Sequence, residues 1–110
     1  MQKLVNYHSN FAHGTVFRFP GSYPHEKYVD LILVEFPDSD RKFGLVVTTG
    51  HKAGLILIKL PKEAESNNFA GIDRQWVIDN WNKWIYETCN VDDVYVIQNY
   101  PIPVIDYSKS

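Results

Sequence analysis

The sequence predicts an α+β fold in which an antiparallel sheet of about five strands carries one main α-helix on one face. Five apolar segments have the length and composition of strands, and the connections between the strands that precede the helix are short, which favours antiparallel pairing. Residues 73–88 show the periodicity of a helix. A chain of 110 residues, 45% of them hydrophobic, can bury one core, so we expect a single domain over residues 1–110.

The first two predicted strands are TVFRF at residues 15–19 and YVDLILVEF at residues 28–36. Pro20-Gly21 ends the first strand, and a loop continues through residues 22–24. Side chains alternate along a strand, so 28–36 has two faces. One face carries Tyr28, Asp30, Ile32, Val34 and Phe36, and the other carries Val29, Leu31, Leu33 and Glu35. Because both faces are apolar in the middle, we expect a central strand that is covered on both sides.

The next two strands are predicted at residues 43–49 and 54–60, and the segment TTGHKAG, residues 48–54, contains the connection between them. A phosphate-binding Walker loop needs a Gly-Lys-Ser/Thr sequence that leads into a helix, whereas this segment leads into a strand. It is therefore interpreted as a hairpin turn. We expect Gly50 and Gly54 to supply positive φ or bulge positions, with His51 and Lys52 exposed at the tip.

The predicted helix spans residues 73–88, with Asp73 as its N-cap and Cys89-Asn90 at its end. At 100° per residue, one arc of about 140° forms the face expected to pack on the sheet. That face consists of Val77, Ile78, Trp81, Trp84, Ile85, Thr88 and Cys89. A last strand is predicted at residues 93–100, followed by an extended tail, PIPVIDYSKS.

Trp76 does not fit the apolar face of this helix. It falls on the polar side, among Asn80, Lys83 and Glu87. An exposed Trp is typical of binding hot spots, so one interpretation is a contact with a partner. The other is local: Trp76 lies in the first turn and is covered by the preceding loop, for instance by Phe69, or by the tail of the chain.

The sequence predicts no catalytic residues, no metal site and no cofactor. His8, His13, His25 and His51 have no metal-ligand spacing, and no G-x-S-x-G motif is present. At a helix C-terminus the negative end of the dipole is expected to raise the pKa of the Cys89 thiol, which makes it a poor nucleophile.

The composition indicates a cytoplasmic protein that binds neither nucleic acid nor membranes directly. The formal net charge is −2, and no basic stripe typical of nucleic-acid binding is visible. One cysteine favours a reducing compartment. The first residues, MQKLVNYHSNF, lack the apolar core of a signal peptide, and no apolar run reaches the length of a membrane span.

Carboxylates gather in the predicted turns, as at Asp38 and Asp40 in PDSDRK, residues 37–42. They are interpreted either as solvated turn residues or as an acidic surface matched to a basic protein such as a nuclease. The candidate partner-binding residues are Trp76, Lys83, Glu87, Asp38, Asp40 and His51.

Two segments carry a resemblance to known proteins, GHKAGLILIKLPKEA at residues 50–64 and GIDRQWVIDNWNKWIYETC at residues 71–89. The hairpin followed by Pro-Lys-Glu-Ala, together with the Trp-rich helix, resembles small immunity proteins encoded beside bacterial polymorphic toxins, including those of contact-dependent growth inhibition systems. The resemblance implies a non-enzymatic inhibitor that binds a cognate toxin domain in the cytoplasm. It assigns no toxin-contacting residue.

Two alternatives remain open at this level. The first is a small enzyme or ligand-binding domain with a pocket between helix and sheet, using His51, Lys52 or the tyrosines. The second is a homodimeric adaptor whose second sheet face forms the interface.

Overall fold

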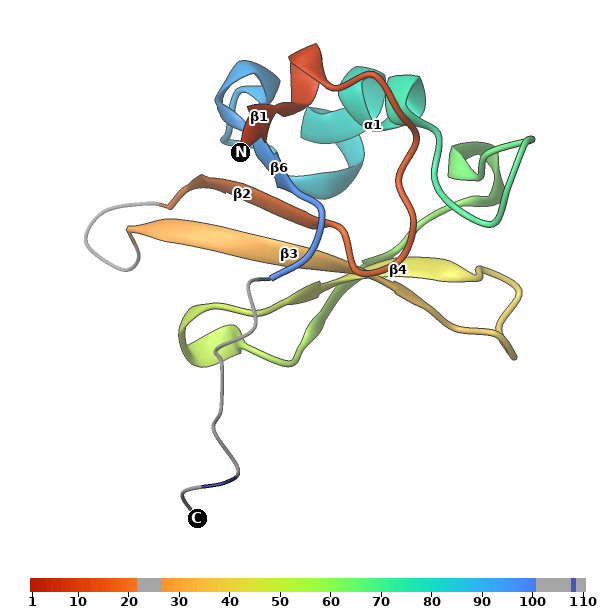
Figure 1. Ribbon diagram of the computed structural model, residues 1–110, viewed down its shortest axis with the longest axis horizontal. Helices are drawn as coiled ribbons and strands as arrows, with labels where there is room; N and C mark the ends of the chain where they lie inside the picture. The colour runs from red at the N-terminus through yellow and green to blue at the C-terminus, as the bar shows by residue number, and fades with distance from the viewer. Residues whose placement is uncertain (22–26, 101–107, 109–110) are drawn as a thin grey trace.

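The computed structural model describes residues 1–21, 27–100 and 108. Within these residues six strands form one antiparallel sheet in the order β1-β6-β2-β3-β4-β5 (Figure 1). The strands are β1 Gln2–Lys3, β2 Val16–Pro20, β3 Tyr28–Glu35, β4 Phe43–Val47, β5 Ile56–Lys59 and β6 Tyr95–Ile97. The prediction of an α+β fold is confirmed. The strand count is slightly higher than predicted, because Gln2 and Lys3 pair with β6.

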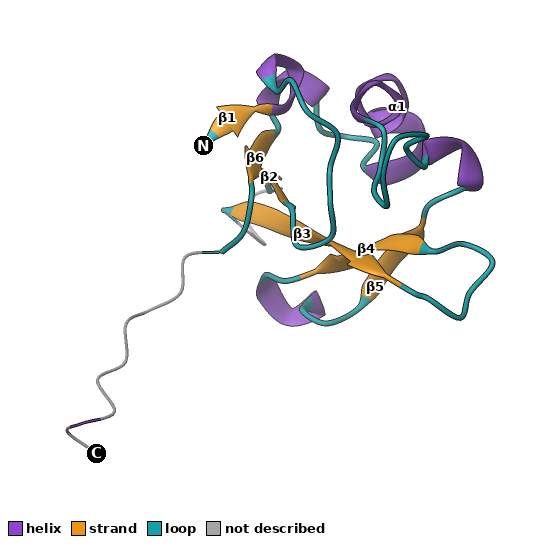
Figure 2. Cartoon of the chain, turned by 45° about the vertical axis from the view of Figure 1, so that its right-hand side comes forward, coloured by secondary structure: helices purple, strands orange, loops and turns teal. Residues whose placement is uncertain are grey.

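The main helix lies over one face of the sheet (Figures 1 and 2). It begins as α1, Arg74–Asn80, and continues as a π-helical turn, η4, Trp81–Ile85, so that the whole segment has 12 residues. Asp73 is the N-cap as predicted, since its carboxylate accepts a hydrogen bond from the backbone N–H of Trp76 at 2.9 Å. Four short 3₁₀ helices complete the described structure: η1 Leu4–Asn6, η2 Gly50–Lys52, η3 Lys62–Ala64 and η5 Val91–Asp93.

The helix ends at Ile85, three residues before the predicted end at Thr88. Tyr86 is extended (φ −146°, ψ 109°), and Thr88 is exposed, so its placement on the buried face was wrong. The amide of Asn82 explains the early end. Its Nδ2 donates to the backbone oxygens of Tyr86 and Glu87, both at 3.2 Å, and of Cys89 at 2.6 Å. These bonds hold the chain folded back after the last helical turn.

Asn90 does not end this helix in a left-handed conformation. Its φ is −68°, and its side-chain oxygen instead accepts the backbone N–H of Asp92 at 2.9 Å, which begins η5.

The inner face of the sheet, defined as the face toward α1, carries the core. Val29, Leu31 and Leu33 of β3 are buried there, as the predicted alternation requires. Ile32 and Val34 lie on the opposite, outer face and are half-buried. The predicted two-sided character of β3 is therefore present, although its apolar side chains are fully buried on the inner face only.

Aromatic rings fill the space between the helix and the sheet. Trp81 is fully buried, and its ring meets Phe17 at 5.9 Å and Phe19 at 5.4 Å between centroids, both edge to face. Phe11, from the N-terminal segment, meets Phe17 at 5.0 Å. Edge-to-face contacts of this kind add to the free energy gained by burying the rings. These rings occupy the region where the alternative interpretation placed a ligand pocket.

The turn between β4 and β5 agrees with its prediction. Gly50 and Gly54 have φ of 70° and 93°, and His51 and Lys52 are exposed within η2. Both glycines therefore occupy the left-handed region, where a side chain would be strained. The predicted loop through residues 22–24 and most of the predicted tail, residues 101–107 and 109–110, lie outside the described residues.

Candidate functional site

The predicted partner-binding residues lie in three separate places. Asp38 and Asp40 are exposed in the turn between β3 and β4, whereas His51 is exposed in the turn between β4 and β5. Since β4 runs from one turn to the other, the two turns lie at opposite ends of that strand. Lys83 and Glu87 are exposed on the helical side of the molecule. The structure thus brings together only the helical residues.

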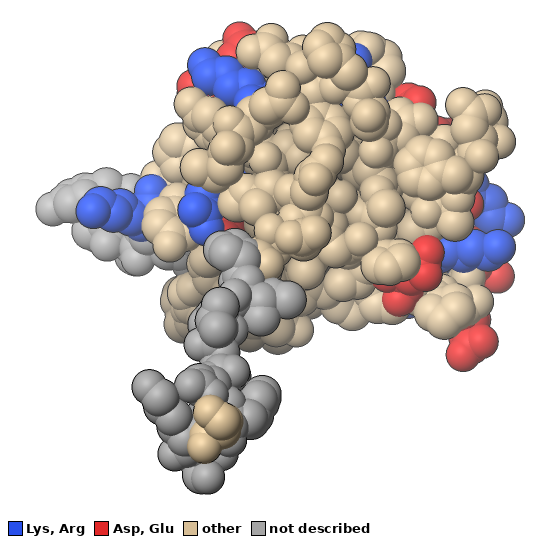
Figure 3. Space-filling model, viewed as in Figure 1, with Lys and Arg blue, Asp and Glu red and all other residues tan. Residues whose placement is uncertain are grey.

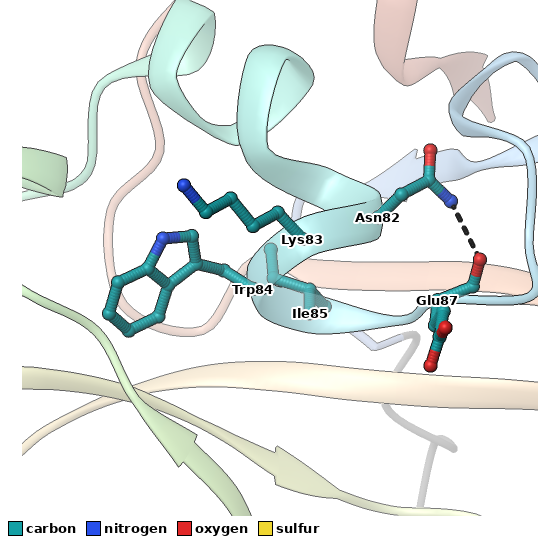
Figure 4. Close-up of a pocket in the computed structure, with 5 residues that line it drawn as sticks. All are labelled: Asn82, Lys83, Trp84, Ile85 and Glu87. Atoms are coloured by element: carbon teal, nitrogen blue, oxygen red, sulfur yellow. Dashed lines mark hydrogen bonds between the residues drawn. The ribbon is translucent and has the colours of Figure 1, made fainter.

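The helical residues surround a surface depression of about 410 Å³, which we call the helical depression (Figure 4). Its lining consists of Asn82, Lys83, Trp84, Ile85 and Glu87. Lys83 and Trp84 lie on one side of it in this view, and Asn82 and Glu87 on the other. The lining thus combines a lysine, a glutamate, an amide and a tryptophan, of which only the tryptophan belongs to the residue types enriched at protein interfaces.

Trp76 does not lie on an exposed polar face. It is half-buried and packs against the core, with its ring centroid 6.0 Å from that of Trp84. In a regular α-helix these two residues would be about 80° apart around the axis. The π turn rotates each residue by a smaller angle, which brings Trp84 beneath Trp76. Trp84 thus partly covers Trp76 from within the helical segment, whereas the local interpretation had named the preceding loop or the tail. A contact between Trp76 and a partner stays a prediction.

The acidic turn between β3 and β4 is not a surface of one sign. Asp38 and Asp40 are followed directly by Arg41 and Lys42, and acidic and basic side chains lie side by side at this end of the molecule (Figure 3). A second depression of about 460 Å³ next to it also contains both signs. It is lined by Ser39, Asp40, Lys42, Lys62, Glu65, Ser66 and Asn67. A strong field directed at a basic partner is therefore absent from these described residues.

The outer face of the sheet carries a polar network that the sequence analysis missed. Asp30 of β3 is buried and forms a two-point ion pair with its cross-strand neighbour Arg18, with Nε–Oδ1 at 2.7 Å and Nη2–Oδ2 at 2.8 Å. The hydroxyl of Tyr100 donates to Asp30 Oδ2 at 2.8 Å and also bonds the hydroxyl of Thr48. In the sequence, Arg18 and Asp30 carry opposite charges and each lies inside a predicted apolar strand. That pattern was the signal available for predicting the pair.

This network changes the proton affinity of two of its members. The hydrogen bond and charge of Asp30 raise the pKa of Arg18 above its ordinary value, so the ion pair stays charged. Burial raises the pKa of the Tyr100 hydroxyl, and its bond to Asp30 adds to this effect, since a phenolate beside a carboxylate would be repelled. The Arg18 guanidinium also lies 4.4 Å from the centre of the Tyr28 ring, a cation–π contact.

Cys89 is buried, and its pKa is raised as predicted, but for a different main reason. The larger cause is burial, and the charge of Asp93 is the second. The helix dipole contributes little because the helix has already ended at Ile85.

Over residues 1–21 and 27–100, no three His, Cys, Asp or Glu side chains gather in a way that would hold a metal ion. No helix in the described part of the chain is long and apolar enough to cross a membrane.

Comparison with known families decides the class of protein. The family model described as Immunity protein 45 matches residues 4–96, most of the chain. The chain belongs to this immunity protein family. No curated protein and no solved structure matches it. The matched residues of this immunity protein include Arg18, Asp30 and the complete helical segment, whereas Tyr100 lies just beyond them.

Membership confirms the resemblance to immunity proteins of toxin systems. It also makes a toxin the general class of partner for this immunity protein. None of the six predicted contact residues is tested by the family match, and they stay predictions.

Proposed function

We propose that this immunity protein binds and neutralises one cognate toxin domain in the cytoplasm of the cell that makes both proteins. The match to the immunity protein family over residues 4–96 is the observation that carries the proposal. The aromatic core between helix and sheet supports a rigid, preformed binding surface, because close-packed rings leave little room for rearrangement on binding. The single cysteine, which is buried and unpaired with another, is consistent with a reducing compartment.

We further propose that the system is a bacterial polymorphic toxin system, such as one for contact-dependent growth inhibition. In such a system sister cells exchange the toxin, and the immunity protein protects them. The Gly-x-Lys-Ala-Gly turn and the Trp-rich helix support this finer assignment by resemblance.

A nuclease domain is the toxin class that we expect. Nucleases bind phosphates with basic surfaces, and this chain has a net charge of −2 with exposed carboxylates at Asp92 and Asp93. Occlusion of the active site and blocked access of the substrate would both follow from binding at such a surface.

The decisive experiment pairs the chain with the product of the gene immediately upstream of its own. We expect the two to co-purify with a 1:1 stoichiometry, and we expect co-expression to restore growth of cells that make the upstream product. The purified toxin is then assayed on DNA and RNA with and without the chain. Growth arrest that persists despite high expression of the chain would rule out the proposed function, and a toxin inactive on both nucleic acids would rule out the nuclease assignment alone.

A further inference from the structure

β5 forms one edge of the sheet, and three consecutive apolar side chains are exposed where it begins, Leu55 just before the strand and Ile56 and Leu57 within it. Within the described residues it pairs with β4 and with no strand on its outer side. The exposed fractions are 59% for Leu55, 52% for Ile56 and 39% for Leu57. Edge strands usually avoid such a stretch, because an apolar edge with unpaired backbone groups readily takes up another strand.

On this edge, the backbone N–H and C=O groups that are free to pair with another strand belong to Ile56. The N–H of Val47 donates to the carbonyl oxygen of Leu55 at 2.9 Å, so Leu55 faces β4. Bonded and outward-pointing residues alternate along an antiparallel strand, and the N–H and C=O of Ile56 therefore point away from β4. Leu57 follows as the extra residue of a β-bulge, which limits the regular part of the edge.

The other end of the edge is already occupied. Nη1 of Arg41 donates to the backbone oxygen of Lys59 at 3.3 Å, so this carbonyl has a partner. The open part of β5 is consequently the segment Leu55–Leu57, which we call the β5 edge. Its short length suits one bound segment rather than open-ended assembly.

The β5 edge continues an apolar row on the outer face of the sheet. Ile56 lies beside Val46, Val46 lies beside Ile32, and Ile32 lies beside Val16 in the strand register. A strand added next to β5 would place its own side chain beside Ile56 and lengthen this row. Cross-strand apolar pairs of this kind stabilise a sheet.

The charge next to the open part of the β5 edge is positive. Residues 43–62 contain no Asp or Glu, and Lys52 in η2 lies exposed just before Leu55. At the other end the charges are mixed, because Nζ of Lys59 donates to Oγ of Ser39 at 3.4 Å, and Ser39 stands between Asp38 and Asp40. A segment that is apolar in its centre and carries a carboxylate at the Lys52 end is therefore complementary to the edge.

A second copy of this chain fits the edge poorly. Antiparallel pairing of β5 with itself would bring Lys52 of one copy towards Lys59 of the other, which places like charges together. Four-residue strands are also only about 13 Å long. Their pairing would bury far less than the roughly 1,200 Å² at which stable interfaces begin.

We propose that the β5 edge binds an extended segment of the cognate toxin, apolar in its centre and with an Asp or Glu at the end that meets Lys52, which joins the sheet as a further strand. This proposal rests on the proposed function, because the toxin supplies the occupant. It adds the surface and the recognition chemistry, which consists of main-chain hydrogen bonds at Ile56 and an ion pair at Lys52.

The β5 edge is tested by measuring the Kd between four variants of this chain and the purified protein encoded by the gene immediately upstream. Ile56→Lys places a charge in the edge, and Lys52→Glu reverses the charge at one end while leaving the strand intact. We expect each to weaken the measured Kd by about tenfold or more, the size of a hot-spot effect. Phe69→Lys is the matched control for Ile56→Lys, since Phe69 is exposed but lies outside the sheet, and its Kd should stay within about twofold of the unsubstituted chain. Lys83→Glu tests the helical depression as the competing binding surface.

Hydrogen exchange of the complex gives the second readout, with protection expected at the amides of residues 55–58. Unchanged Kd in both edge variants, or a large loss only in Lys83→Glu, overturns the edge proposal while the immunity function stands. A dimer of the free chain that Ile56→Lys converts to a monomer overturns it in favour of a second copy. If the unsubstituted chain does not bind the upstream product at all, the proposed function fails first.

Discussion

The carboxylate of Asp30 and the guanidinium of Arg18 form a two-point ion pair across β2 and β3, at 2.7 and 2.8 Å, with Asp30 only 1% exposed. The pair lies on the outer face of the sheet, away from the aromatic core under the helix. A buried charge is tolerated only while its partner stays in place, because the desolvation cost of each ion is offset by the other. The outer face therefore depends on this pair for its structure.

Asp30→Asn should lower the free energy of unfolding by about 3 kcal/mol, because it leaves the guanidinium of Arg18 without its counter-charge. We expect the lower end of the usual range, since 30% of the Arg18 side chain remains exposed to water. Urea denaturation measures the change. The double variant Arg18→Met, Asp30→Leu should lose less than the single one. Glu35→Gln, which disrupts an exposed pair with His13, is the control and should cost less than about 1 kcal/mol.

Tyr100→Phe should destabilise the fold by about 1–2 kcal/mol, since it removes a hydrogen bond to a charged carboxylate. The pKa of Tyr100 is raised in the folded state, so its contribution is fully present below the ordinary pKa of about 10 and is lost as the pH rises through the folded-state pKa. Unfolding curves from pH 8 upward should therefore converge for the two proteins at high pH. A constant difference across the whole range would contradict this assignment.

Trp81 and Trp76 of the helix should differ in their effect on stability. Trp81→Ala should cost about 3–5 kcal/mol, as expected for a fully buried aromatic residue. Trp76→Ala should cost about 1–3 kcal/mol because the ring is only half-buried against Trp84. Thermal and urea unfolding measure both changes. A negligible stability loss for Trp76→Ala, combined with weaker toxin binding, would restore the interpretation of Trp76 as a binding hot spot.

Local patterns predicted the parts of this fold that depend on neighbouring residues. Alternation identified the inner face of β3, the position of Asp73 identified the start of the helix, and two glycines identified the hairpin turn. Each of these features is determined within a few residues of the chain. The patterns therefore carried enough information to predict the α+β fold.

The features that were missed depend on contacts between distant residues or on a subtle change of helical geometry. Asp30 and Arg18 meet only because of the strand register, and Tyr100 reaches Asp30 from 70 residues away. The π turn at residues 81–85 has no sequence signal, yet it decides that Trp76 meets Trp84. The apolar residues of β5 indicate a binding surface only because β5 lies at an edge of the sheet. That position can be recognised only once the order of all six strands is known.

Gly71→Ala should destabilise the fold by about 3 kcal/mol, because an added Cβ would lie 2.4 Å from the backbone oxygen of Phe11. That oxygen accepts the N–H of Ile72 at 2.7 Å, so the backbone cannot shift without losing the contact between the two segments. Gly54→Ala is the comparison, since its Cβ would meet nothing within 4 Å but its φ is 93°. It should cost about 1–2 kcal/mol from backbone strain alone. Equal melting temperatures for Gly71→Ala and the unsubstituted chain would show that the bridge at Phe11 is not rigid.

Asn82→Asp should destabilise the end of the helix by about 1–2 kcal/mol, although it changes one side-chain nitrogen into oxygen. The amide Nδ2 donates to three backbone oxygens, those of Tyr86, Glu87 and Cys89. A carboxylate in its place would face these same oxygens with no proton to donate. The chain after the helix should then loosen, and because Cys89 is buried by this turn, its thiol should react faster with an alkylating reagent. Asn67→Asp, at an exposed loop position, is the control for the added charge. If Cys89 reacts at the same rate in Asn82→Asp and in the control, the amide does not hold the turn, and the early end of the helix must come from the π turn alone.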